Sequence, residues 1–307
     1  MVSNSGGKVE SLLRTWRMRD AVKLALQDER ALGELLSLID EDDVSVQIRA
    51  LSALLELVRG ANWRLRKRIL ETGFKHIINA LKSDDVRVLW RTLAILSYLL
   101  KNNPLNGGRL SKLVRVLLLT AKTHNGLVWD GLLSAVENIR APCMSDEVAE
   151  FLLEKVRNGS YEEAAVASLI LLNSGAVERH GWKSVVERVG EIISTGDPEL
   201  IEAGLHAAMK LTKLPTVFPM DVVMKSLIPS LRRFISTCND PIRKQTAIEV
   251  FDRLRDMVVR YYRVRPREAQ RIAEELSRLG LLEEAYLIAS NVASVGGLVS
   301  LWNDRPT

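Results

Sequence analysis

Basic side chains are concentrated in one stretch of this sequence, residues 61–120. The stretch carries twelve lysines and arginines but only three acidic residues, whereas the whole chain of 307 residues has a formal net charge of +5. Cations grouped in this way attract the phosphates of a nucleic acid or the carboxylates of an acidic protein surface. A solvated helix face is the simpler alternative, because charged side chains normally occupy such faces.

The basic residues of this stretch recur at helical spacing. Arg64, Arg68, Lys75 and Lys82 lie four or seven residues apart, which places them on one face of a helix expected over 62–82. A second expected helix, over 109–122, repeats the pattern with Arg109, Lys112 and Arg115. We expect the two faces to form one continuous patch. The candidate partner-binding residues of this region are Arg64, Arg68, Lys75, Lys82, Arg87, Trp90, Arg91, Arg109, Lys112, Arg115, Trp129 and Asp130.

Two of these candidates are tryptophans in matching places. The sequence Trp90-Arg91-Thr92-Leu93 aligns with Trp129-Asp130-Gly131-Leu132. Two stacked tryptophans beside a charged side chain form a candidate recognition hot spot, because Trp and Arg often dominate binding energies. Packing of both rings in the core between neighbouring helices is the alternative, which the usual burial of tryptophan favours.

A second basic cluster surrounds two tyrosines nearer the end of the sequence. Arginines interleaved with aromatic rings suit a phosphate backbone or stacked bases. We favour the alternative, in which the tyrosines pack the last helical pair onto the one before it. The cluster consists of Arg260, Tyr261, Tyr262, Arg263, Arg265, Arg267 and Arg271.

No catalytic pattern accompanies the basic residues. The sequence contains no nucleophile elbow, no phosphate-cradling glycine-rich loop and no His-Glu-x-x-His motif. Its four histidines and two cysteines show no metal-ligand or redox spacing. We therefore expect no catalytic residue, no cofactor and no bound metal, and we expect a cytoplasmic location.

The helices that are expected to position these residues recur along the sequence with a period of 42 residues. Residues 42–51 return as residues 84–93, and eight positions of the extended repeat are identical. The apolar residues follow helical rather than strand spacing along the whole sequence. Self-similarity of this kind is typical of stacked helical hairpins.

The expected architecture is an all-α solenoid of about seven hairpins that forms a right-handed superhelix. Capping helices over 9–19 and 20–28 follow a disordered start at 1–8, so that residues 1–28 cap the array. The repeats occupy 29–262, and a last capping hairpin and tail occupy 263–307, all within one continuous domain. No segment is expected to insert into a membrane.

The repeats resemble HEAT repeats, within the broader HEAT/armadillo superfamily. In that family a turn Asp is followed six residues later by an Arg, and Asp43/Arg49 and Asp85/Arg91 match this spacing. Pro229, inside an expected first helix, resembles the family's kink-forming proline. The resemblance implies a ladder of Asp–Arg pairs between repeats, with first helices on the convex surface and second helices on the concave one.

This resemblance covers about residues 29–260 and is clearest in the first two repeats. Asp130 and Ala203 stand at the place of the arginine in the third and fifth repeats, so the implied ladder is interrupted there. The resemblance implies a scaffolding function and no particular activity.

The leading hypothesis is a non-enzymatic scaffold that binds another protein through its curved surface and the basic stretch 61–120. The alternative is a HEAT-like protein that binds nucleic acid, with phosphate contacts from 61–120 and 253–271. A DNA glycosylase-like activity, with Trp90, Trp129 and Asp130 as its pocket, is a more distant variant that rests on fold analogy alone.

Overall fold

The part of the chain that the structure describes consists of helices joined by turns and short loops, and it contains no strand. The computed structural model describes residues 7–105, 107–123, 125–141, 144–175, 181–213 and 219–296. The chain divides into two compact units: Met1–Ala149 with Leu169–Ala176, and Glu150–Ser168 with Val177–Thr307. The predicted all-α class is confirmed, whereas the single continuous domain, the number of hairpins and the handedness of the superhelix stay predictions.

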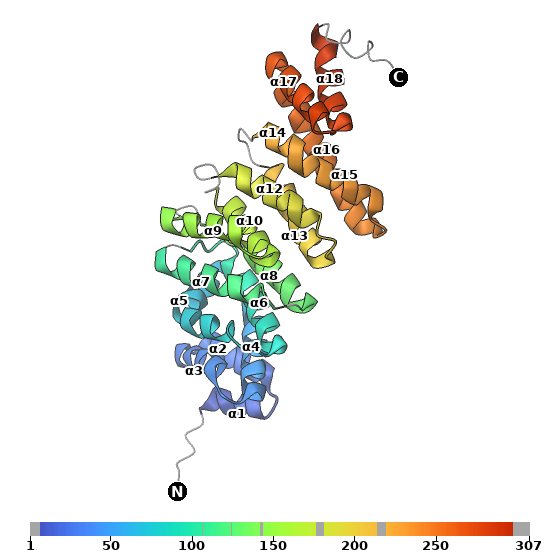
Figure 1. Cartoon of the computed structure of the whole chain (residues 1–307). Helices are drawn as coiled ribbons and strands as arrows, with labels where there is room; N and C mark the ends of the chain where they lie inside the picture. Colours follow the sequence, from blue (N-terminus) through green and yellow to red (C-terminus); the bar gives the residue numbers. More distant parts are fainter. Residues whose placement is uncertain are drawn as a thin grey trace. The chain divides into compact units, whose positions relative to one another are not determined.

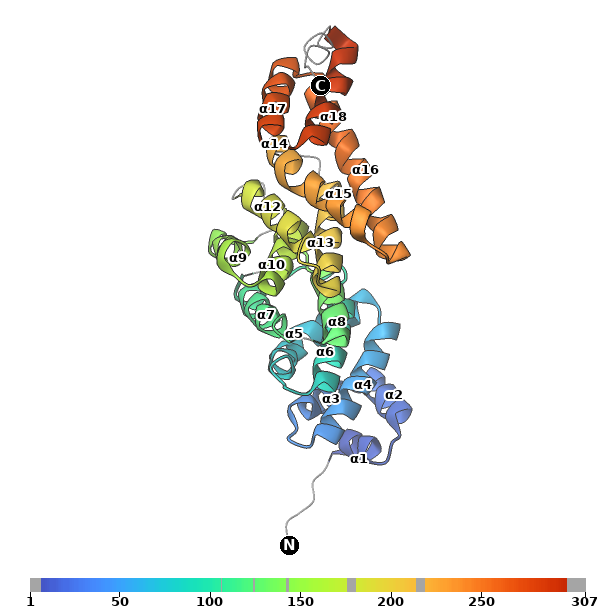
Figure 2. The same ribbon diagram turned by 45° about the vertical axis from the view of Figure 1, so that its right-hand side comes forward.

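The first unit stacks its helices in two layers. Helices α1, α3, α5 and α7 contact one another in order in one layer, and α2, α4, α6 and α8 do so in the other (Figures 1 and 2). Successive hairpins therefore lie side by side, as expected for a solenoid. The bounds are α1 Lys8–Arg14, α2 Met18–Gln27, α3 Glu29–Ser37, the 3₁₀ turn η1 Leu38–Asp40, α4 Val44–Gly60, α5 Trp63–Ala80, α6 Val86–Leu100, α7 Gly107–Thr120 and α8 Gly126–Glu137.

The repeated Asp-Asp-Val sequence starts two helices of the second layer. The carboxylate of Asp43 accepts a hydrogen bond from the backbone N–H of Ser45 at 2.9 Å, and that of Asp85 accepts one from Arg87 at 2.7 Å. These caps satisfy N–H groups that lack an acceptor within the helix. Asp43 and Asp85 are therefore the N-caps of α4 and α6.

The leucines repeated at the 42-residue offset form the core of the first unit. Leu51 and Leu54 of α4, like Leu93 and Leu96 of α6, have no exposed surface. Complete burial of one such side chain contributes about 1.5–3 kcal/mol. The sequence repeat therefore records the packing of one hairpin on the next.

The first two helices break at a different place from the one predicted. Instead of helices over 9–19 and 20–28, α1 ends at Arg14 and α2 begins at Met18. Lys8 is already helical, which corrects the predicted disorder at that residue, and residues 1–6 lie outside the described part. Trp16 therefore lies in the turn between the two helices.

The second unit is built in the same way. Helix α12 contacts the π-helical turn η2 and α15, while α13, α16 and α18 contact one another in order. Helices α9 (Asp146–Asn158) and α10 (Tyr161–Ser174) contribute residues to both units. The other bounds are α12 Trp182–Ile193, α13 Pro198–Leu211, α14 Met220–Val222, η2 Val223–Leu227, α15 Ile228–Thr237, α16 Pro241–Arg263, α17 Pro266–Arg278 and α18 Leu282–Gly296.

The helical stretch 220–237 is irregular next to the proline that resembles the HEAT kink residue. The π-helical turn η2 comes directly before α15, whose second residue is Pro229. Proline lacks an N–H group, and its ring crowds the carbonyl group four residues earlier. The wider π turn accommodates that ring without ending the helix. Among the described helices of both units, none has the length and apolar character needed to cross a membrane.

Candidate functional site

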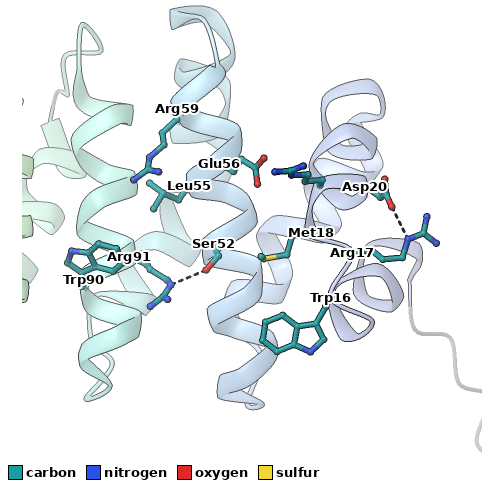
Figure 3. Close-up of a pocket in the computed structure, with 11 residues that line it drawn as sticks. Trp16, Arg17, Met18, Asp20, Ser52, Leu55, Glu56, Arg59, Trp90 and Arg91 are labelled. Atoms are coloured by element: carbon teal, nitrogen blue, oxygen red, sulfur yellow. Dashed lines mark hydrogen bonds and ion pairs between the residues drawn. The ribbon is translucent and has the colours of Figure 1, made fainter.

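A groove of about 700 Å³ runs over the second-layer face of the first unit, across α2, α4 and α6 (Figure 3). We call it the α2–α4–α6 groove. Its walls combine two tryptophans, four arginines, two carboxylates and two apolar side chains. The lining residues are Trp16, Arg17, Met18, Arg19, Asp20, Ser52, Leu55, Glu56, Arg59, Trp90 and Arg91.

Trp16 stands at one end of this groove in a strained conformation. Its φ angle is 61°, and its indole ring is 69% exposed. The turn is a Schellman motif, in which Trp16 N–H donates to Leu13 O at 3.1 Å and Arg17 N–H donates to Leu12 O at 2.8 Å. Glycine is the usual residue at this position, and a bulky one costs about 1–3 kcal/mol. The turn thus holds an exposed aromatic ring in one fixed place.

Arg49 of α4 secures this turn. Its Nη1 donates hydrogen bonds to the carbonyl oxygens of Leu13 and Arg14, each at 3.2 Å, and its guanidinium lies 4.2 Å from the centre of the Trp16 ring. The arginine therefore closes the end of α1 and covers part of the indole ring. This contact corrects the Asp–Arg ladder that the family resemblance implied, because Arg49 bonds to backbone carbonyls and stacks on an aromatic ring.

Arg91 and Trp90 of α6 line the groove on its other side. The Nε of Arg91 donates to the Oγ of Ser52 at 2.9 Å, its Nη1 donates to the carbonyl of Arg87 at 2.9 Å, and its guanidinium lies 5.3 Å from the Trp90 ring. Arg91 thus reaches the neighbouring repeat through a serine, not through the aspartate of the implied ladder. Figure 3 shows this bond beside the labelled Trp90 ring.

The charges at the start of α6 favour an anion near Arg91. Partial burial lowers the pKa of Arg91, and the positive charge of Arg87 lowers it further. Arg87 itself pairs with Asp85 at 2.7 Å, and hydrogen bonding to Arg87 lowers the pKa of Asp85 to about 2. That carboxylate is therefore committed to Arg87 and to the helix cap, and it does not contact Arg91.

The second predicted tryptophan is not part of this groove. Trp129 of α8 is 3% exposed and belongs to the core, whereas Trp90 is half-buried and faces the groove. Asp130 is exposed but does not line the groove. The predicted pair of recognition tryptophans is therefore wrong, and with it the glycosylase-like pocket. Trp90 instead lines the same groove as Trp16, from the opposite side (Figure 3).

The predicted basic side chains of the first layer are exposed. We call the exposed basic residues of α5 and α7, together with Lys82 in the turn after α5, the basic face. Two of its arginines lie against aromatic rings, Arg64 at 5.5 Å from Trp63 and Arg109 at 5.7 Å from Phe74. Arg68 lies 3.9 Å from Glu29. The basic face comprises Arg64, Arg68, Lys75, Lys82, Arg109, Lys112 and Arg115.

The second basic cluster lies at the junction of α16 and α17. Tyr262 is 3% exposed, and its ring meets that of Tyr261 edge to face at 5.0 Å. The guanidinium of Arg265 stacks on Tyr261 at 4.1 Å. Packing, the interpretation favoured from the sequence, therefore describes Tyr262. The remaining arginines, Arg260, Arg263, Arg267 and Arg271, are exposed.

Sequence reasoning missed most of the groove. It placed Trp16 inside a helix and gave no function to Met18, Ser52, Glu56 or Arg59. One sequence feature could have pointed to the groove. In Trp16-Arg17-Met18-Arg19-Asp20 an aromatic residue stands among charged ones, where the helical spacing of apolar residues is interrupted. In the described ranges, no three His, Cys, Asp or Glu side chains gather where they could hold a metal.

Comparison with solved structures identifies the fold. A HEAT-like repeat protein from Thermococcus onnurineus NA1 superimposes with a TM-score of 0.68, at 22% identity over 82% of this chain and 97% of that one. The chain has the fold of a HEAT-like repeat protein. Two further structures are less similar. An engineered protein has a TM-score of 0.48 at 18% identity, over 94% of this chain and 79% of that one. A designed armadillo repeat protein has a TM-score of 0.43 at 14% identity, over 73% of this chain and 99% of that one.

The resemblance to HEAT repeats inferred from the turn Asp and the following Arg is thus confirmed at the level of the fold. The sequence matches none of the family models and none of the curated proteins with which it was compared.

Proposed function

We propose that this HEAT-like chain is a non-enzymatic scaffold that binds a segment of a partner protein in the α2–α4–α6 groove. The observation that carries the proposal is that Trp16, Trp90 and four arginines line one groove. Trp and Arg are the residues most enriched among those that dominate protein–protein binding energies. A hollow of about 700 Å³ also has the size of known ligand sites.

The contacts that hold Trp16 in place support the same proposal. An exposed tryptophan held by the Schellman turn and by Arg49 loses little side-chain freedom when a partner binds. Each rotamer-rich side chain immobilised on binding otherwise costs about 0.5–1.5 kcal/mol. A fixed aromatic surface beside a fixed guanidinium therefore suits recognition.

A displayed library of random short peptides tests this function. Peptides enriched on the wild-type chain should bind at least roughly thirtyfold more weakly to Trp16→Ala/Trp90→Ala, because truncation of a hot-spot residue costs about 2 kcal/mol or more. Trp63→Ala is the matched control, since that ring is 55% exposed but lies on α5 of the first layer. Peptides that bind the groove variant and the wild-type chain equally well would contradict the proposal, and so would a library that yields none.

A second candidate function, binding of nucleic acid, has one specific observation in its favour. Within the described ranges, Lys75 of α5, Lys82 in the turn after α5 and Lys112 of α7 are exposed and have no carboxylate within 4 Å. Ammonium groups without acidic neighbours release counterions when they meet phosphates, which drives binding. We propose the basic face as the surface for such contacts.

Fluorescence anisotropy with labelled duplex and single-stranded DNA tests the second function. Affinity should fall steeply with salt, and Lys75→Glu/Lys112→Glu should weaken binding for every sequence alike. Lys23→Glu, a reversal of an exposed charge on α2 of the other layer, should change the affinity far less. Binding that does not respond to salt, or that Lys23→Glu weakens equally, would remove this candidate.

A further inference from the structure

Arg91 has hydrogen-bonding capacity that the protein does not use. Its guanidinium has five N–H groups, and its hydrogen bonds to the described residues occupy one on Nε and one on Nη1. Those two bonds, to Ser52 and to the Arg87 carbonyl, fix the plane of the guanidinium. A planar cation held in place with free N–H groups matches the geometry of a carboxylate.

The groove around Arg91 has more positive than negative charge. Of its two carboxylates, Asp20 is already paired with Arg17 at 2.8 Å. Arg59 lies over the ring of Tyr98 at 6.0 Å and has no carboxylate among the described residues within 4 Å. The field in the groove therefore attracts an acidic group.

Apolar and hydrogen-bonding surfaces lie beside this charge. Trp16 offers a ring that is 69% exposed, Leu55 is 7% exposed, and Met18 is half-buried. Glu56 is exposed, and its carboxylate is an acceptor for the N–H groups of an extended backbone.

We propose that the occupant of the α2–α4–α6 groove is an extended acidic segment of a partner protein. A Glu or Asp side chain of that segment pairs with Arg91, and a neighbouring aromatic or apolar side chain packs against Trp16. The inference rests on the proposed protein-binding function and adds the chemistry of the partner. It also assigns Arg91 the role of selecting acidic over neutral segments.

Two labelled peptides that differ only in charge test the inference. One alternates Glu with Trp and Leu, and the other has Gln in place of each Glu. The wild-type chain should bind the Glu peptide at least roughly tenfold more tightly, because charge-assisted hydrogen bonds are about twice as strong as neutral ones. Arg91→Met should abolish the preference, and Arg91→Lys should retain only part of it, because an ammonium group cannot form the two-pronged bond.

Controls separate this inference from the proposed function. Arg64→Met removes an exposed guanidinium from α5 and should leave the preference for Glu unchanged. Equal binding of the two peptides by the wild-type chain, or a preference that survives in Arg91→Met, would overturn the inference. Selected peptides that are neutral yet depend on Trp16 would overturn it too, while leaving the protein-binding function intact. Displacement of the Glu peptide by a single-stranded oligonucleotide in a Lys75→Glu/Lys112→Glu background would also count against it.

Discussion

Replacement of Trp129 with alanine will lower the free energy of unfolding by about 3–5 kcal/mol, the usual cost of truncating a buried aromatic side chain. The ring is 3% exposed in the core of the first unit, and the cavity left behind cannot close completely because neighbouring helices are held apart by their other contacts. Urea denaturation followed by circular dichroism measures the change.

Trp90→Ala is the matched control for that experiment. Trp90 occupies the equivalent place on α6 but is half-buried and faces the groove, so its loss should cost only about 1 kcal/mol, as for an average substitution. It should instead reduce peptide binding. Equal destabilisation by the two variants would show that Trp90 is a core residue and would weaken the assignment of the groove.

A second large effect is expected in the other unit, at Arg232 of α15. Its Nη1 lies 3.1 Å from Oε1 of Glu284 on α18, whose side chain is 5% exposed, and it also pairs with Glu283. Arg232→Met leaves the buried carboxylate without its counter-charge. We expect a loss of about 3 kcal/mol, the lower end of the range for breaking a buried ion pair, because the guanidinium keeps some contact with solvent.

The two adjacent glutamates provide the control. Glu283→Gln removes a carboxylate that is 74% exposed, so its effect should stay within about 0.5 kcal/mol. The double variant Arg232→Met/Glu284→Met should recover most of the stability lost in Arg232→Met, since no unpaired charge then remains buried. A double variant as unstable as the sum of its two single variants would disprove the coupling.

The periodic features of this protein were predictable from its sequence. Asp43 and Asp85 start their helices wherever the rest of the chain lies, because an N-cap bonds to N–H groups two or three residues away. Leu51 and Leu93 become buried because a 3.6-residue period puts them on one face of a helix. The HEAT-like fold follows from such local rules, repeated along the chain.

The groove did not follow from these rules. Trp90 and Trp129 occupy equivalent places in sequence, yet only the packing around each helix decides that one ring is exposed to the groove and the other is buried. Sequence equivalence describes a residue's position on its own helix and says nothing about the neighbour that covers it.

Arg49 and Arg91 illustrate the same division. The sequence by itself determined that each arginine lies six residues after a turn aspartate, on the same face of its helix. Only the tertiary structure decided their partners, because a long side chain bonds to whatever acceptor the adjacent hairpin offers. That acceptor is the C-terminal end of α1 beside Trp16 for Arg49, and Ser52 for Arg91. The candidate site arises from those contacts between hairpins, which no helical period encodes.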